Sequence, residues 1–159
     1  MRKTLIATTT ASLLVLAGVG SALGHGAERP SHIHAGACPA PGDVVAALEN
    51  TVSVPGEAAG PESAIPVEVG TSTVEIPLDD IVAGGHAIVV HHDPEDMATY
   101  LVCGDIGGVV GEDGSLAVGL GPVGESSRFG TGVLTDNGDG TTSVVVYLAN
   151  PGAVAAVVG

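Results

Sequence analysis

Histidines in two short segments are the residues of this chain whose types and spacing suit metal chemistry. His32 and His34 flank a single residue in the segment 30–38, and His91 and His92 end an apolar run. On an extended strand, side chains two positions apart share a face, so His32 and His34 point the same way. Imidazole nitrogens are common ligands of transition metals, and a histidine from a second strand would complete the set. The sequence therefore predicts a metal site shared by the two segments.

The second segment offers two neighbouring histidines, which strand geometry separates. His91 shares a face with Val89, whereas His92 falls on the other face with His86. Only one of His91 and His92 can therefore join a site on a single face. The acidic run at 93–96 either orients a ligand histidine through its second ring nitrogen or forms a solvated turn. Solvated histidines that bind no metal are the competing interpretation of both segments.

Residues 1–24 have the pattern of a secretory signal peptide, with a basic start, an apolar stretch from Leu5 to Val19 and a small-x-small cleavage site ending at Gly24. Cleavage there leaves residues 25–159. They contain two arginines and all 18 acidic residues, so their net charge is −16. That charge argues against nucleic acid or an anionic membrane as a partner. No later apolar run reaches the roughly 18 residues that span a bilayer. We therefore expect a secreted protein, or one on the cell-envelope exterior, without a transmembrane segment after signal removal.

The chain has two cysteines, and each follows one of the histidine segments: Cys38 and Cys103. In an exported protein without a Cys-x-x-Cys redox pair, two cysteines are expected to form a disulfide. The closed loop of about 65 residues would stabilise the fold by about 4 kcal/mol in the chain-entropy model. The bond would also tie the two halves of the predicted site together.

Short alternating strands separated by glycine and proline predict a single all-β domain over 25–159, either a β-sandwich or a small barrel. An immunoglobulin-like sandwich is the competitor, although the chain has no tryptophan to support it. The stretch 52–66 is expected to be a long surface loop, and 109–127 is a second glycine-rich region. Strands are expected at 72–76, 85–91 and 101–106, with a hairpin over 130–148.

The chemistry-bearing residues resemble those of the Cu/Zn superoxide dismutases. The run from His32 to Cys38 is similar to that family's copper-binding His-x-His and the disulfide cysteine that follows it. Val89 to His91, with the acidic residues after them, is similar to the family's later copper-ligand strand, and Cys103-Gly-Asp-Ile is similar to the ending that closes its disulfide. The resemblance implies a Greek-key β-barrel, copper held by His32, His34 and His91, and a bond between Cys38 and Cys103.

The chain also departs from that family. No histidine lies between Cys38 and His86, so the bridging histidine and the zinc loop have no counterpart and no zinc is expected. The arginine that attracts superoxide in the family, three residues before the last cysteine, is Tyr100 here. The chain continues well beyond Cys103, where the family would soon end. A circular permutation explains this if the hairpin over 130–148 supplies the strands that the family places before its His-x-His.

Two functional interpretations follow. The first is an exported, copper-binding, superoxide dismutase-like protein that disproportionates superoxide at a three-histidine site. The alternative is a non-catalytic extracellular β-sandwich module that stores or delivers copper, or binds no metal. A hydrolase is disfavoured because no nucleophile motif is visible and both cysteines are expected to be paired. Replacing His34 by Ala is expected to abolish activity in an enzyme and to change nothing measurable in a structural module.

Overall fold

The computed structural model of this protein describes residues 28–57 and 59–152. Its elements, in chain order, are β1 (Arg29–Ala35), β2 (Val44–Ser53), β3 (Val67–Val74), α1 (Leu78–Ala83), β4 (His86–Asp93), β5 (Asp96–Asp105), β6 (Ser115–Pro122), β7 (Phe129–Asp136) and β8 (Thr142–Ala149). The expected all-β class is confirmed. The predicted signal peptide over 1–24 lies outside the described residues.

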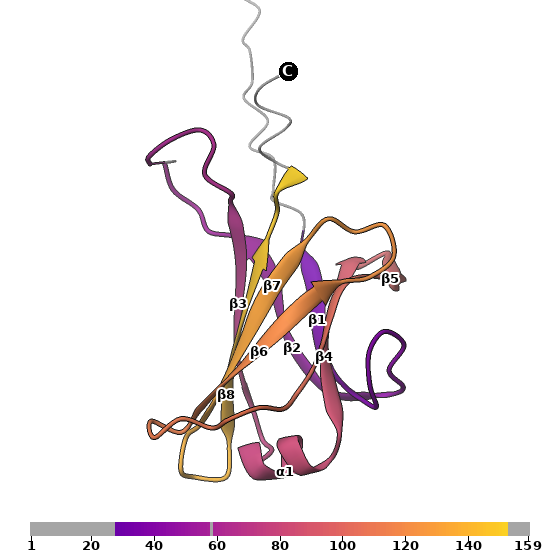
Figure 1. The fold of residues 1–159 in the computed structure, drawn as a ribbon, viewed down its shortest axis with the longest axis vertical. Helices are drawn as coiled ribbons and strands as arrows, with labels where there is room; N and C mark the ends of the chain where they lie inside the picture. Colours follow the sequence, from indigo (N-terminus) through magenta and orange to yellow (C-terminus); the bar gives the residue numbers. More distant parts are fainter. Residues whose placement is uncertain (1–27, 58, 153–159) are drawn as a thin grey trace, which may run out of the picture.

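All eight strands pair antiparallel and close into one barrel, in the order β1-β2-β3-β8-β7-β6-β5-β4 (Figure 1). Closure arises because β4 does not pair with β3, the strand before it in the chain, but returns to pair with β1. The first four strands therefore lie in the order β4-β1-β2-β3. A closed barrel leaves no unpaired edge strand, unlike the open sandwich that the sequence also allowed.

The predicted hairpin over 130–148 is confirmed as β7 and β8, which pair from Phe129 with Ala149 to Asp136 with Thr142. Its strands show the alternation that motivated the prediction. Val144 and Val146 are 1% exposed and point into the barrel, whereas Tyr147 is 43% exposed on the outer surface. The hairpin thus forms the wall of the barrel opposite β1 and shares one apolar core with Ile33 of β1.

Other strand predictions are confirmed with shifted bounds, at β3, β4 and β5, but β2 and β6 were not expected. The glycine-rich region 109–127 contains β6 at Ser115–Pro122. A Cβ atom on Gly104 of β5 would lie 2.2 Å from the carbonyl oxygen of Gly119 of β6. Glycine therefore marks a close approach between two strands here, not only a loop.

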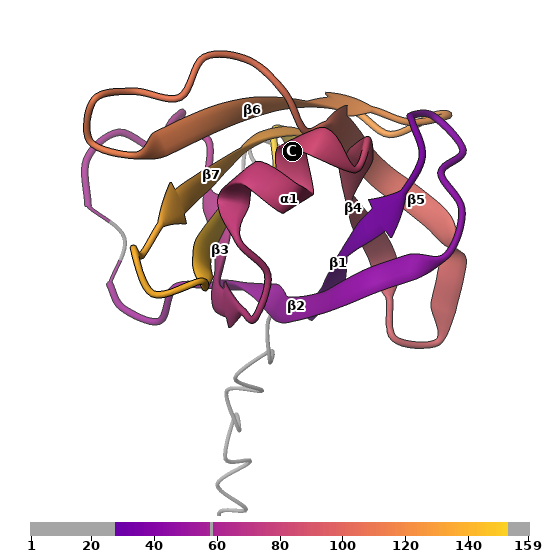
Figure 2. The ribbon, with the colours of Figure 1, turned by 90° about the horizontal axis from the view of Figure 1, so that it is seen from below.

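The short helix α1 closes one end of the barrel, as Figure 2 shows in the view along its length. Leu78 and Ile81 are 3% and 0% exposed and join the apolar core. With six residues, α1 is too short to produce a helical repeat in the sequence, and it was not expected. It occupies the crossover from β3 to β4. Within the described residues, no helix is long and apolar enough to cross a membrane.

A buried ion-pair cluster lies at the opposite end of the barrel, near the starts of β1, β3 and β7. Glu68 is 6% exposed, and its carboxylate accepts a hydrogen bond of 2.9 Å from Arg128. Its other oxygen lies 3.5 Å from Nε of Arg29. Arg29 also donates to the backbone carbonyl of His92. Both arginines of the described chain thus converge on one carboxylate.

Candidate metal centre

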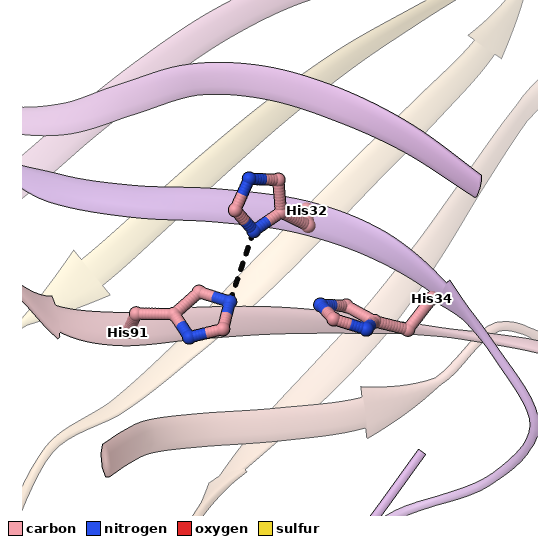
Figure 3. A group of neighbouring side chains, drawn as sticks. All are labelled: His32, His34 and His91. Atoms are coloured by element: carbon pink, nitrogen blue, oxygen red, sulfur yellow. Dashed lines mark hydrogen bonds between the residues drawn. The ribbon is translucent and has the colours of Figure 1, made fainter. Parts of the chain in front are cut away.

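The pairing of β1 with β4 brings the two histidine segments together on the outer wall of the barrel. His32 lies opposite Val89, and His91 follows two residues later on the same face of β4. One nitrogen from each of His32, His34 and His91 lies within 4.8 Å of the others, an arrangement that could hold a metal ion (Figure 3). When metal–nitrogen bonds are about 2.0 Å long, the nitrogens that bind one ion lie roughly 3–4 Å from one another. The three imidazole nitrogens would therefore need to move only slightly closer together to bind an ion.

His34 is held by its backbone surroundings in the form that a metal requires. It is 4% exposed, and its Nδ1 donates a hydrogen bond of 2.8 Å to the carbonyl oxygen of Gly42. Because Nδ1 carries the proton, Nε2 of the neutral ring presents a lone pair. That Nε2 is buried and has no hydrogen-bond partner. An unpaired buried polar atom is costly unless something binds it, and a metal ion would satisfy it.

His91 has the same arrangement on the other strand. It is 3% exposed, and its Nδ1 donates a hydrogen bond of 2.6 Å to the carbonyl oxygen of Met97. Its Nε2 lies 2.9 Å from Nδ1 of His32, the contact drawn as a dashed line in Figure 3. The ligand atoms offered are therefore Nδ1 of His32 and Nε2 of both His34 and His91. Carbonyl partners on the second nitrogen orient such rings and raise their basicity.

Burial favours the neutral, metal-binding form of two of these rings. The pKa of His32 lies below its usual value, first because of desolvation and then because of the nearby His91 and His34. Desolvation also lowers the pKa of His91, partly offset by its bond to the Met97 carbonyl. Three imidazoles crowded together cannot all carry a proton without repulsion. The neutral rings can therefore bind a metal cation.

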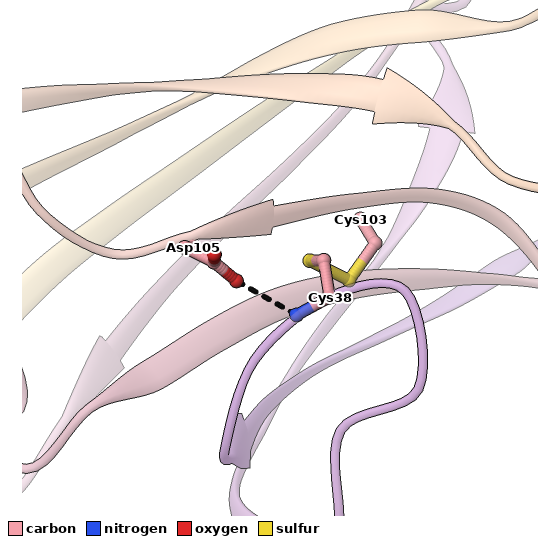
Figure 4. Close-up of a disulfide and its surroundings, with 3 residues drawn as sticks. All are labelled: Cys38, Cys103 and Asp105. Atoms are coloured by element: carbon pink, nitrogen blue, oxygen red, sulfur yellow. Dashed lines mark hydrogen bonds between the residues drawn. A yellow bond between two sulfur atoms is a disulfide. The ribbon is translucent and has the colours of Figure 1, made fainter.

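Tyr100 and the disulfide border the histidines. Tyr100 pairs across the strands with His91, and its ring meets that of His91 edge-on at 5.1 Å between centroids. Cys38 and Cys103 form the predicted disulfide, with Cα atoms 5.8 Å apart, and the backbone N–H of Cys38 donates to Asp105 (Figure 4). Tyr100 and the disulfide pack in one small cluster on the outer face of β4 and β5. The bond thus anchors the loop after β1 beside the site.

Among the described residues, the other two histidines, His86 and His92, stay outside this group. His92 is exposed, and its Nδ1 lies 2.7 Å from the carboxylate of Asp93. The pKa of Asp93 is lowered by hydrogen bonds, first from the backbone N–H of Glu95 and then from His92. The acidic run thus orients His92 and its own turn, while the Met97 carbonyl orients His91. His86 bonds to the carbonyl of Ile81 at the start of β4.

Sequence reasoning missed the two carbonyl groups that orient the ligands. Those of Gly42 and Met97 are backbone atoms, so no residue type signals them in the sequence. Comparison of the chain with protein-family models, curated proteins and solved structures finds no match. The geometry of the group is therefore the basis for a functional proposal.

Proposed function

We propose that this protein is an exported copper protein of the superoxide dismutase-like class, with copper held by His32, His34 and His91. The single observation that carries the proposal is the convergence of three imidazole nitrogens, one of them buried and unpaired. Imidazole ligation suits copper, and a three-nitrogen set leaves a position open for a small molecule. The order of residues that resembles the family, His-x-His, Cys, His and Cys, supports copper over other metals.

The topology supports the same class. The order β4-β1-β2-β3 is the spatial order of a Greek key, the arrangement that the resemblance implies. The strands that follow Cys103 complete the barrel, because β6 pairs with β5 and β8 pairs with β3. In a circularly permuted chain, the strands that the family places before its His-x-His would follow the last cysteine. They would still have to pair with the other strands to complete the barrel.

In the proposed reaction, bound copper supplies one-electron chemistry, by which one superoxide is oxidised to dioxygen and a second is reduced, with two protons, to hydrogen peroxide. His32, His34 and His91 would bind the ion, and the carbonyls of Gly42 and Met97 would keep the rings of His34 and His91 oriented. His32 is the most exposed of the three, so its side of the group faces solvent. Solvent on that side would supply the protons of the reaction.

The alternative, storage or delivery of copper without turnover, is favoured by one observation. Tyr100, a neutral side chain, lies beside His91 where the family has a cation. The described chain has two arginines, and Glu68 binds both. An anionic substrate would therefore meet an acidic protein with no local cation at the described site to attract it. Turnover by the copper-loaded protein separates the two functions.

The test combines binding and activity on the same samples. We expect the oxidised protein without its signal peptide to bind one equivalent of Cu(II), with an electron paramagnetic resonance spectrum that shows coupling to several nitrogens. Replacing His91 by Ala should alter the spectrum, whereas replacing the adjacent, exposed His92 by Ala should not. A spectrum unchanged in both variants would refute the site.

Activity is then measured on the loaded protein. Superoxide disproportionation that disappears in His34→Ala, while the folded circular dichroism spectrum persists, would support a dismutase. Copper binding without turnover, together with transfer of the metal to a competing chelator, would support the storage or delivery function instead.

A further inference from the structure

The hydrogen-bonded ladder between β1 and β4 ends just before His91. Five residue pairs join the two strands, and the last of them is Ser31 with Val90. The next residue of β1 toward its start is Pro30, which has no backbone N–H to donate. His91 thus lies one residue beyond the paired part of β4, although its ring must stay beside His32 to share a metal ion.

The pairing of β4 with its other neighbour, β5, is also irregular at His91. The register shifts between Val90 and His91, and again between His91 and Asp93. Irregular pairing of this kind re-aims side chains, because the residues of the two strands no longer alternate together. Backbone pairing alone therefore does not fix the segment 91–93, and side-chain contacts must contribute.

Arg29 makes such a contact from β1. Its Nη1 donates a hydrogen bond to the backbone carbonyl of His92. If the register of β1 with β4 continued past Pro30, Arg29 would lie opposite His92. The Arg29 side chain therefore continues the contact between the two strands where Pro30 interrupts their backbone pairing. It does so one residue after His91.

Arg29 is itself held in place by the buried ion-pair cluster. Its Nε lies 3.5 Å from one carboxylate oxygen of Glu68, and its side chain is 12% exposed. Arg128 binds the other oxygen of that carboxylate at 2.9 Å. A guanidinium is planar and has donors along several edges, so it binds a carboxylate and a carbonyl at the same time in a fixed geometry. Arg29 thereby connects β3 to the end of β4.

We propose that Arg29 is a positioning residue of the metal centre: its guanidinium holds the end of β4 against β1 and so keeps the ring of His91 beside that of His32. The inference rests on the proposed copper function. The Met97 carbonyl sets the rotation of the His91 ring, whereas Arg29 sets the place of the backbone that carries it. The distance that this arrangement preserves is the 2.9 Å between Nε2 of His91 and Nδ1 of His32.

A matched pair of variants separates this role from the contribution of the ion-pair cluster to stability. Arg29→Met and Arg128→Met each take one arginine from Glu68 and leave the other paired with it. Methionine is unbranched and apolar, and it has no N–H or O–H to donate. Only Arg29→Met also removes the hydrogen bond to the His92 carbonyl. Urea unfolding followed by circular dichroism checks that both variants are folded and compares their stabilities.

The first readout is the Cu(II) affinity of the oxidised protein without its signal peptide, measured by competition with a chelator. We expect Arg29→Met to weaken binding at least about tenfold, the usual effect of removing a group that orients a ligand, and to alter the electron paramagnetic resonance spectrum. Arg128→Met should leave both unchanged. Arg29→Lys is the second variant if Arg29→Met does not fold. It keeps the charge beside Glu68, but its single nitrogen cannot occupy the places of both Nε and Nη1, so the same weakening is expected.

The metal-free protein gives a second readout that does not depend on copper. Nδ1 of His91 donates to the Met97 carbonyl, so its Nε2 is the acceptor and Nδ1 of His32 carries the shared proton when both rings are neutral. Nitrogen-15 NMR spectra of the imidazoles, recorded at a pH where the rings are neutral, should show this His32 tautomer in the unaltered protein and in Arg128→Met. In Arg29→Met, His32 should show a mixture of tautomers, because its partner has moved.

The outcomes distinguish this inference from the proposed function. If the unaltered protein binds no copper, the proposed function fails, and the His32 tautomer decides whether Arg29 positions His91. Equal copper affinities in Arg29→Met and Arg128→Met would overturn the positioning role of Arg29. A His32 tautomer that Arg29→Met does not change would also overturn it.

Discussion

Replacing Glu68 by Gln is expected to destabilise the barrel far more than replacing either of the arginines that it binds. The carboxylate is buried between Arg128, at 2.9 Å, and Arg29, at 3.5 Å. The side chains of the two arginines are 13% and 12% exposed. The cluster therefore holds two positive charges and one negative charge away from most of the solvent, and its net charge is +1.

The two substitutions change this charge in opposite directions. Glu68→Gln leaves two largely buried cations without a counter-ion. Removing one partner of a buried ion pair costs about 3–5 kcal/mol of unfolding free energy. Arg128→Gln leaves a neutral pair between Glu68 and Arg29. Its cost is then mainly the lost charge-assisted hydrogen bond, about 1.5–3 kcal/mol. We expect Glu68→Gln to be the more destabilising by about 2 kcal/mol.

Urea unfolding followed by circular dichroism measures the difference, provided that the slope m is the same for all variants. Glu49→Gln removes the same charge from an exposed side chain on the neighbouring strand β2, and we expect it to change stability by less than about 0.5 kcal/mol. If Arg128→Gln destabilises as much as Glu68→Gln, the net charge of the cluster does not control its energy, and the reasoning is wrong.

Three further predictions concern the site and its surroundings. Burial lowers the folded pKa of His32 and His91 below the usual 6.5, so the stability that these neutral rings contribute is present above pH 6.5 and is lost as the pH falls below it. Urea unfolding of the metal-free protein at neutral and mildly acidic pH checks this, and no loss of stability on acidification would contradict it. Replacing Cys38 and Cys103 by Ser should cost about 4 kcal/mol of unfolding free energy, and a loss below about 1 kcal/mol would show that the loop is constrained without the bond. For the proposed superoxide disproportionation, Tyr100→Arg should raise the rate at low salt, and the gain should shrink as salt increases; a rate that the substitution does not change would exclude electrostatic attraction as the rate limit.

Local patterns predicted the strands with clear alternation and the pairing of the two cysteines. The β7–β8 hairpin followed from alternating residues around a glycine-rich turn, because strand periodicity is a property of the backbone itself. β6 was missed because Gly119 and Gly121 break the alternation. The close approach of Gly104 of β5 to the backbone of Gly119 is a tertiary contact that the sequence does not show.

The burial of Glu68 had no signal in the sequence either. It occupies an inward position on β3, where an apolar residue is expected. Two arginines, one on the first strand and one just before β7, reach it only once the barrel is closed. Partners that are distant in the chain decide whether a charge can be buried.

For the candidate metal centre, the sequence alone determined that His32 and His34 share a face, because side chains alternate along any strand. Strand parity left His91 and His92 as alternatives, and the resemblance favoured His91. The tertiary structure decided between them: the pairing of β1 with β4 places His91 beside His32, and the Met97 carbonyl sets its ring. Those contacts join segments far apart in the chain, so they depend on barrel closure and not on local geometry.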